Sequence, residues 1–179
     1  PLLNEGRVNY QGELISCEAQ TFFKPEQPTQ VIVAALGPQA LKVTGRLADG
    51  TTLAWVGPRT VREHIKPRLS EAASDAGRAA PRIISTLPVC VTDNQNGVIK
   101  LISNSLKMYA ELPSYKAMFE RDGVNERGEL ALVGSASKVG DLIAELAEAG
   151  VTDFAASEFT TNDDERSQTR ELLKKLETV

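Results

Sequence analysis

The most regular feature of the hydrophobic pattern is a pair of short apolar runs that each end in Gly-Pro. The first spans residues 31–38 and the second spans 53–58, and a segment with helical spacing separates them. An unbroken apolar run of this length is typical of a strand buried on both faces, and proline suits the first position of a helix. The pattern therefore predicts strand, turn and helix twice over, as in a parallel α/β fold.

The segment between the two runs has one apolar face and a clear stop at Asp49-Gly50. This periodicity predicts a helix that packs on the sheet. The residues expected on its inward face are Ala40, Leu41, Thr44, Leu47 and Ala48.

Two interpretations of the Gly-Pro turns stand side by side. The turns begin helices at Gly37 and Gly57. Free N–H groups at a helix start attract phosphate or carboxylate, and glycine lets a ligand approach the backbone. A Gly-Pro pair is also common in turns that bind no ligand. Spacing leaves both interpretations open.

The rest of the chain continues the alternation of strands and helices. Alternation over 7–17 predicts a β-hairpin, followed by a loop over 18–30. Pro67 should kink or split the next helix, and Pro88 favours an edge or irregular position in its strand. An apolar stripe on the following helix comprises Val98, Leu101, Ile102, Leu106 and Tyr109. The remaining predicted elements are a helix over 58–77, a strand over 81–93, two helical pieces over 95–121, a strand over 130–134, a helix over 136–149 capped by Ser135, a buried strand over 151–156 and a helix from about 163 to 175.

Few side chains suggest chemistry of their own. The single histidine, His64, falls on a charged helix and is expected to be solvated, with a functional role as the alternative. Cys17 and Cys90 are isolated in apolar surroundings, so both are expected in the core. Gly134-Ser135 is either a plain cap or an anion site. The sequence supports neither a metal site nor a Ser-His-Asp triad.

Composition narrows the class of protein. Hydrophobic residues make up 41% of the chain, charged residues 25%, and the net charge is −4. Lysine and arginine are scattered among acids, so nucleic-acid binding is not expected. No apolar run approaches the about 20 residues of a membrane-spanning helix. We expect a cytoplasmic protein without membrane or nucleic-acid partners.

An ordered set of short motifs resembles the luciferase-like monooxygenase superfamily, especially its branch that depends on the deazaflavin coenzyme F-420. The motifs run from near Gly6 to the end of the chain. They are residues 34–38, Gly45 with 48–50, Trp55 with 57–60, 87–89 with 91–93, 112–115, 133–134 and 149–154.

The resemblance implies a partial fold. The family fold is a (β/α)8 barrel, which needs about 250 residues, so 179 residues correspond to its C-terminal half. We expect a single domain over 1–179. Residues 1–29 would form a hairpin and loop insertion and residues 30–179 the βα units. The chain is then either a fragment of a longer protein or a natural half-barrel.

The resemblance also places a cofactor against two strand ends. Small residues there allow a flat ring or a phosphate tail to approach the backbone. Arg59 is either a partner for a phosphate or acidic substrate, or a surface residue at a helix start. No catalytic acid or base is predicted. The predicted cofactor contacts are Ala34, Ala35, Leu36, Gly37, Pro38, Val56, Gly57, Arg59 and Thr60.

The function implied by the resemblance is that of a deazaflavin-dependent oxidoreductase that moves a hydride to or from a small organic substrate. One alternative is a monooxygenase of the same superfamily that uses FMN. Another is a non-catalytic half-barrel that associates with itself. The expected partners are a small-molecule substrate and either further copies of the chain or a missing N-terminal half.

Overall fold

The computed structural model describes residues 1–23, 25–105 and 107–177. It divides the chain into two compact units, Pro1–Val31 and Ile32–Val179. Unit 1 denotes the first of these below, and unit 2 the second. The expectation of a single domain stays a prediction. Leu106, which was assigned to an apolar stripe, lies outside the described residues.

Unit 1 contains the predicted hairpin. After the short helix α1 (Leu2–Glu5), strand β1 (Arg7–Gln11) pairs antiparallel with β2 (Ser16–Gln20). The second strand continues three residues beyond Cys17, into the segment expected to be loop. Cys17 is exposed, so its assignment to the core is wrong. The hairpin is a two-stranded ribbon within its unit, and alternation along such a ribbon does not bury either face.

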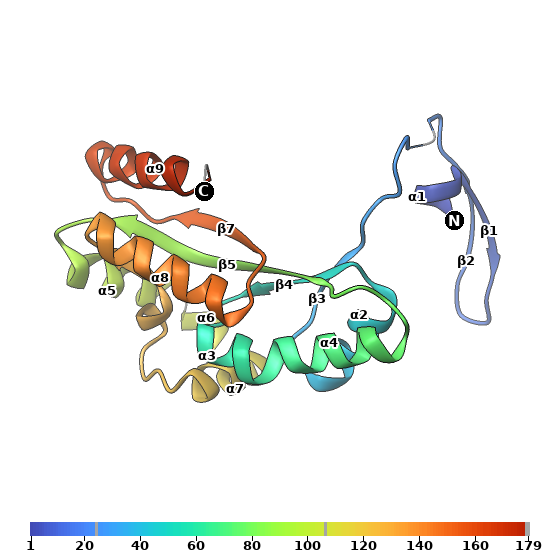
Figure 1. Cartoon of the computed structure of the whole chain (residues 1–179), viewed down its shortest axis with the longest axis horizontal. Helices are drawn as coiled ribbons and strands as arrows, with labels where there is room; N and C mark the ends of the chain where they lie inside the picture. The colour runs from blue at the N-terminus through green and yellow to red at the C-terminus, as the bar shows by residue number, and fades with distance from the viewer. Residues whose placement is uncertain (24, 106, 178–179) are drawn as a thin grey trace. The chain divides into compact units, whose positions relative to one another are not determined.

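Unit 2 is built on a parallel sheet, which confirms the predicted α/β class. Its described strands run in the order β3-β4-β5-β6, and β7 pairs with β5 beside that path (Figure 1). Every pairing among them is parallel. The strands are β3 (Ile32–Ala34), β4 (Gly50–Ala54), β5 (Arg82–Val91), β6 (Leu132–Gly134) and β7 (Asp153–Glu158).

Helices follow the strands in alternation, as a chain of βα units requires. Figure 1 shows α2 and α4 side by side below β3 and β4, and α8 alongside β5. The helices of unit 2 are α2 (Pro38–Leu47), α3 (Pro58–Thr60), the π-helical turn η1 (Val61–Ile65), α4 (Lys66–Asp75), α5 (Gln95–Ser105), α6 (Lys107–Ala110), α7 (Pro113–Asp122), the 3-10 turn η2 (Arg127–Leu130), α8 (Ala136–Ala149) and α9 (Asp163–Glu177).

Helix α2 has a narrower buried face than its apolar pattern predicted. Leu41 and Ala48 are buried, whereas Leu47 is 73% exposed. Successive helical residues are about 100° apart, so Leu47 lies on the flank of a face centred on Leu41 and Ala48. Gly45 lies on that face, and a Cβ there would come within 2.5 Å of the Leu69 carbonyl oxygen in α4. Close approach of two helices therefore sets the inward face of α2.

Two strands differ from the prediction because they lie at the sheet edges. Strands β3 and β7 were expected to be buried on both faces, but each pairs with one neighbour among the described residues. Val33 in β3 is 38% exposed, and no residue of β7 is fully buried: half of them are exposed and the others half-buried.

Of the two alternatives for Pro88, the edge is wrong because its strand β5 is central, and the irregular position agrees with the pairing of β5. The pairing of β5 with β4 ends at Thr86, and its pairing with β6 begins at Val89. Pro88 falls in the interval where β5 has only β7 as a neighbour. A residue without an N–H is tolerated in such an interval.

Candidate functional site

A cleft of about 370 Å³ lies where β3 and β4 end. It is the place at which a parallel α/β fold binds its ligands. Its walls come from the end of β3, from β4 and from the first turn of α7. The lining residues are Ala34, Ala35, Leu36, Gly37, Thr52, Ala54, Ser114 and Tyr115.

The β3 side of the cleft is made of small residues with open space before them. Gly37 follows the strand with an extended backbone at φ −79°. No heavy atom lies within 4 Å of the position that a Cβ on Gly37 would take. A ligand can therefore reach the backbone here without meeting a side chain.

The start of α2 opens at the same place. Gly37 is the residue before the helix, and Pro38 is its first residue. Gly37 has no side chain to cap the helix, and no described side chain accepts a hydrogen bond from the N–H groups of Gln39 or Ala40. A helix start with free N–H groups carries partial positive charge and favours an anion.

The start of α3 differs, although it has the same Gly-Pro sequence. Asp122, at the end of α7, accepts hydrogen bonds from the Gly57 N–H at 2.8 Å and from the Thr60 N–H at 2.9 Å. The prediction that both Gly-Pro starts have free N–H groups is therefore wrong for the second one. The carboxylate of Asp122 binds the N–H groups that an anionic ligand would otherwise bind.

The starts of α5 and α8 are closed by side chains next to them in sequence. Asn94 accepts a hydrogen bond from the Gly97 N–H at 3.2 Å. Ser135 accepts one from the Lys138 N–H at 3.3 Å, which supports the plain-cap interpretation of Gly134-Ser135. Neither start leaves an obvious opening for a ligand.

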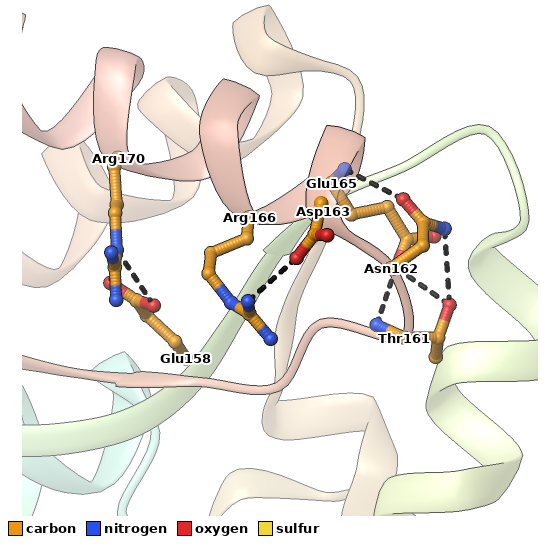
Figure 2. Close-up of polar contacts among 7 residues, drawn as sticks. All are labelled: Glu158, Thr161, Asn162, Asp163, Glu165, Arg166 and Arg170. Carbon is orange, nitrogen blue, oxygen red and sulfur yellow. Dashed lines mark hydrogen bonds and ion pairs between the residues drawn. The ribbon is translucent and has the colours of Figure 1, made fainter.

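The start of α9 is closed most completely (Figure 2). Asn162 accepts a hydrogen bond from the Glu165 N–H, and Glu165 in turn accepts one from the Thr161 N–H at 2.7 Å. The arrangement is similar to a capping box, except that Glu165 accepts from Thr161, one residue before the cap residue Asn162. Glu165 also accepts a hydrogen bond from the Thr92 hydroxyl at 2.6 Å, so the cap ties α9 to the end of β5. Of the helix starts that follow strands in the described part of unit 2, only that of α2 lacks a side-chain partner.

The capping network sets the ionisation of Glu165, which is 8% exposed. Burial by itself raises the pKa of this carboxyl. The hydrogen bonds from Thr92 and Thr161 outweigh burial, so the pKa lies below its usual value of 4.5. Glu165 is therefore charged at neutral pH, and the network stabilises the folded state in its ionised form.

The second group of predicted contacts surrounds the closed start of α3. Val56 is buried, and the Thr60 hydroxyl donates to the Met118 carbonyl oxygen at 3.3 Å. Arg59 is 59% exposed and pairs with Glu63. Of the nine predicted residues, Ala34, Ala35, Leu36 and Gly37 line the cleft. The role of all nine as cofactor contacts stays a prediction.

Tyr115 and Ser114 complete the cleft from the segment 112–115, which carries part of the resemblance but was not among the predicted cofactor contacts. Tyr115 is half-buried, and its ring meets that of Tyr109 edge to face, with centroids 5.3 Å apart. Burial, together with Tyr109, raises the pKa of Tyr115, so its hydroxyl stays protonated at neutral pH. The signal in the sequence was the Leu-Pro pair before Ser114, which starts a new helix and so ends the preceding one.

The backbone is strained where β4 ends beside the cleft. Trp55 is a non-glycine residue with positive φ, 59°, and it is buried. A bulky residue in this region costs about 1–3 kcal/mol, which the surrounding packing must offset. Such positions concentrate at functional sites, which is consistent with the place of Trp55 next to Ala54.

His64 is buried rather than solvated, so that prediction is wrong. Its side chain is 2% exposed, and its Nε2 lies 2.9 Å from the Leu36 carbonyl oxygen. Burial lowers the pKa of the imidazole, and Arg121 and Arg68 lower it further. The prediction assumed α-helical periodicity, but His64 lies in the π-helical turn η1, whose wider turn changes which side chains face inward.

Other features of the described residues do not add a second site. Larger hollows lie along α7, between β7 and α9, and on the hairpin of unit 1. Among the described residues, no three His, Cys, Asp or Glu side chains gather closely enough to hold a metal ion. Cys90 is buried, as predicted, and burial raises the pKa of its thiol to about 11. None of the described helices is both long and apolar enough to cross a membrane.

Comparison with known families shows to which family the chain belongs. A family model described as luciferase-like monooxygenase matches residues 1–153. The chain belongs to the luciferase-like monooxygenase family. This confirms the resemblance carried by the Gly-Pro turns and the motifs after them.

Curated relatives within the luciferase-like family are similar over part of their length. The chain is 32% identical over 88 residues to the F420-dependent glucose-6-phosphate dehydrogenase of Microbacterium testaceum, which covers 48% of this chain and 26% of the relative. It is 33% identical over 90 residues to the protein of that name from Kineococcus radiotolerans, covering 49% and 27%. The aligned part of the chain thus spans about a quarter of these relatives.

Solved structures confirm the fold. The coenzyme F420-dependent tetrahydromethanopterin reductase from Methanopyrus kandleri superposes with a TM-score of 0.75 at 21% identity, covering 96% of this chain and 58% of that one. An F420-dependent secondary alcohol dehydrogenase superposes with a TM-score of 0.72 at 15% identity, covering 91% and 54%. This chain therefore covers a little over half of the length of these two chains.

Proposed function

We propose that this chain forms part of an oxidoreductase that uses the deazaflavin coenzyme F-420 and a small organic substrate. The observation that carries the proposal is the cleft at the ends of β3 and β4, into which the uncapped start of α2 opens. The names of the curated relatives, which are F420-dependent dehydrogenases, support the choice of coenzyme.

The residues present suit such a coenzyme. A deazaflavin coenzyme has a flat ring and a phosphate-bearing tail, and the cleft offers backbone without side chains at Gly37 together with free N–H groups at Gln39 and Ala40. Its volume of about 370 Å³ is within the range of ligand pockets, at the lower end, so it suits part of the coenzyme. When bound, the coenzyme supplies hydride transfer to or from the substrate.

The protein's own contribution at this site is binding, orientation and exclusion of water. The start of α2 attracts the negative end of the ligand and fixes its direction. Ala54 and Thr52 form the floor on the β4 side, and Tyr115 closes the cleft from α7. An aromatic wall over a small-residue floor keeps a flat ring in place and water out.

Titration of the protein as encoded by its own gene tests the proposal. Coenzyme F-420 and FMN are added separately, and binding is followed by coenzyme fluorescence. We expect F-420 to bind at least tenfold more tightly than FMN. Tighter binding of FMN would replace the proposal with the monooxygenase alternative. Binding of neither coenzyme would favour the non-catalytic one.

A variant of the cleft links the binding to its place. Ala54→Leu adds bulk to a lining position, so we expect a loss of at least tenfold in F-420 affinity. Val43→Leu is the matched control, because Val43 is 57% exposed on the outer side of α2. Equal affinities for the two variants would place the coenzyme elsewhere. Glucose 6-phosphate is the first substrate to assay, because the relatives' names specify it.

A second proposal concerns the segment that pairs with the unpaired edges of the sheet. Among the described residues, β3 and β7 each leave one edge unpaired, and Val33 is exposed on β3. Unpaired edges call for cover by further strands. We propose that these come from additional chain of the same protein or from a second copy of it. The mass in solution, compared with the mass of one gene-encoded chain, separates the two sources.

A further inference from the structure

We infer that His64 is a positioning residue that holds the end of β3 in the shape the cleft requires. The contact between His64 and Leu36 is the geometric basis of the inference. Its expected effect on coenzyme binding rests on the proposed function. It assigns a role to the single histidine of the chain, whose side chain contacts the backbone of Leu36, a residue that lines the cleft.

The Leu36 carbonyl needs a partner at this point of the chain. The ladder between β3 and β4 ends at Ala34, opposite Thr52, so Leu36 lies beyond its last pair. The first backbone hydrogen bond of α2 goes from Leu41 to Gly37, one residue further on. Leu36 therefore falls between strand and helix, where neither ladder supplies a donor. The contact is partly buried, and a carbonyl withdrawn from water without a donor is costly.

His64 supplies that donor from a fixed support. Its Nε2 lies 2.9 Å from the Leu36 oxygen, and a carbonyl only accepts, so Nε2 carries the proton and donates. The neighbours Val61 and Ile65 in η1 are fully buried. A side chain held on both sides by core residues presents its N–H in one direction, and so fixes the orientation of the peptide that it binds.

The other ring nitrogen agrees with a neutral imidazole. Nδ1 of His64 is buried, with no hydrogen-bond partner among the described residues. A proton on Nδ1 would be a buried donor without an acceptor, and burial lowers the pKa of this group. The ring thus acts as a steady donor to Leu36 rather than as an acid or a base.

The contact between His64 and Leu36 matters for the cleft because of where Leu36 lies. Leu36 lines the cleft, and the next residue is Gly37, whose open side faces the proposed ligand. Rotation of the peptide between Leu36 and Gly37 would redirect the N–H groups that begin α2. Loss of the donor is therefore expected to weaken coenzyme binding although His64 does not touch the coenzyme.

Three variants of the full protein test the inference by F-420 titration and thermal unfolding. His64→Leu removes the donor, and we expect affinity to fall about tenfold. In His64→Gln the amide can donate to the same oxygen, and we expect affinity within about threefold of wild type. Val98→Ala, at a fully buried position in α5, is the control for lost packing and should lower the melting temperature with little change in affinity.

Hydrogen exchange at the Leu41 amide, whose hydrogen bond to the Gly37 carbonyl oxygen begins α2, gives a readout that does not depend on the coenzyme. We expect exchange there to accelerate in His64→Leu and to return towards wild type in His64→Gln. If wild type binds no coenzyme but exchange follows this pattern, the proposed function fails and the positioning role stands. Wild-type exchange in His64→Leu, or equal losses in the Leu and Gln variants, would overturn the positioning role.

Discussion

The starts of α2 and α3 have the same Gly-Pro sequence and the same place after a strand, yet they present opposite surfaces. At α2, Gly37 faces open space and the first N–H groups have no side-chain partner. At α3, Asp122 accepts hydrogen bonds from Gly57 and Thr60. The comparison teaches that a helix start becomes a candidate site only where the rest of the fold leaves it open. What closes the second start is 62 residues away from Thr60 in sequence.

The largest effect is expected from removal of the carboxylate that closes α3. Asp122→Ala leaves two buried N–H groups without a charged acceptor, so the free energy of unfolding should fall by about 2–3 kcal/mol. Urea unfolding measures this loss. Asp122→Asn keeps one acceptor and should lose less. Sulfate should stabilise Asp122→Ala more than wild type, because the variant opens a second start to anions; equal effects of sulfate would contradict this account of α3.

Alanine at the two glycines gives a matched pair. A Cβ at Gly57 would lie 2.7 Å from the Asp122 carboxylate and 2.7 Å from the Leu130 side chain. Gly57→Ala should therefore cost about 1–3 kcal/mol of stability, as overpacking does. Gly37→Ala meets no atom and should leave the melting temperature unchanged. A comparable loss in both variants would remove the distinction between the two starts.

The closed start of α9 makes a prediction about pH. The folded-state pKa of Glu165 lies below 4.5, so its network stabilises the protein above about pH 4.5 and is lost as the pH falls through the folded value. Glu165→Gln should unfold about 1 kcal/mol more easily at neutral pH, and its stability should change less between pH 5 and 3. Thermal unfolding across that range is the measurement. Parallel pH profiles for the two proteins would show that Glu165 carries no such linkage.

The smallest effect is expected from Arg59, at the closed start. Its side chain is exposed and pairs with Glu63 four residues on. Such surface pairs contribute about 0.3–0.5 kcal/mol. Arg59→Ala should change stability by no more than that and F-420 affinity by less than about twofold. A tenfold loss of affinity would show instead that Arg59 reaches the coenzyme, as the resemblance suggests.

Sequence reasoning located one side of the candidate site but not what surrounds it. The apolar run before Gly37 predicted a strand end, and the small residues there line the cleft. Local periodicity carries such information because strand and helix repeats depend on neighbouring residues. It carried none about Asp122 or Tyr115, which reach the starts of α3 and α2 through tertiary contacts.

The burial of single residues was also beyond local patterns. His64 looked solvated because its neighbours in sequence are charged, whereas a π-helical turn places it in the core. Cys17 looked buried because its surroundings in sequence are apolar, but among the described residues of unit 1 no third strand pairs with its hairpin. In both cases the burial of the residue depends on which element packs against it. Tertiary packing of this kind cannot be read from a single sequence.

The central claim is that the open start of α2 holds the coenzyme, and a change at Gly37 tests it most directly. Gly37→Val fills the open space, and its extended backbone accommodates the side chain, so folding should be unaffected. Gly140→Ala is the control, because a Cβ at Gly140 in α8 also meets open space and Gly140 does not line the cleft. We predict that Gly37→Val lowers F-420 affinity at least tenfold at an unchanged melting temperature, while Gly140→Ala binds as wild type. Wild-type affinity in Gly37→Val would contradict the claim.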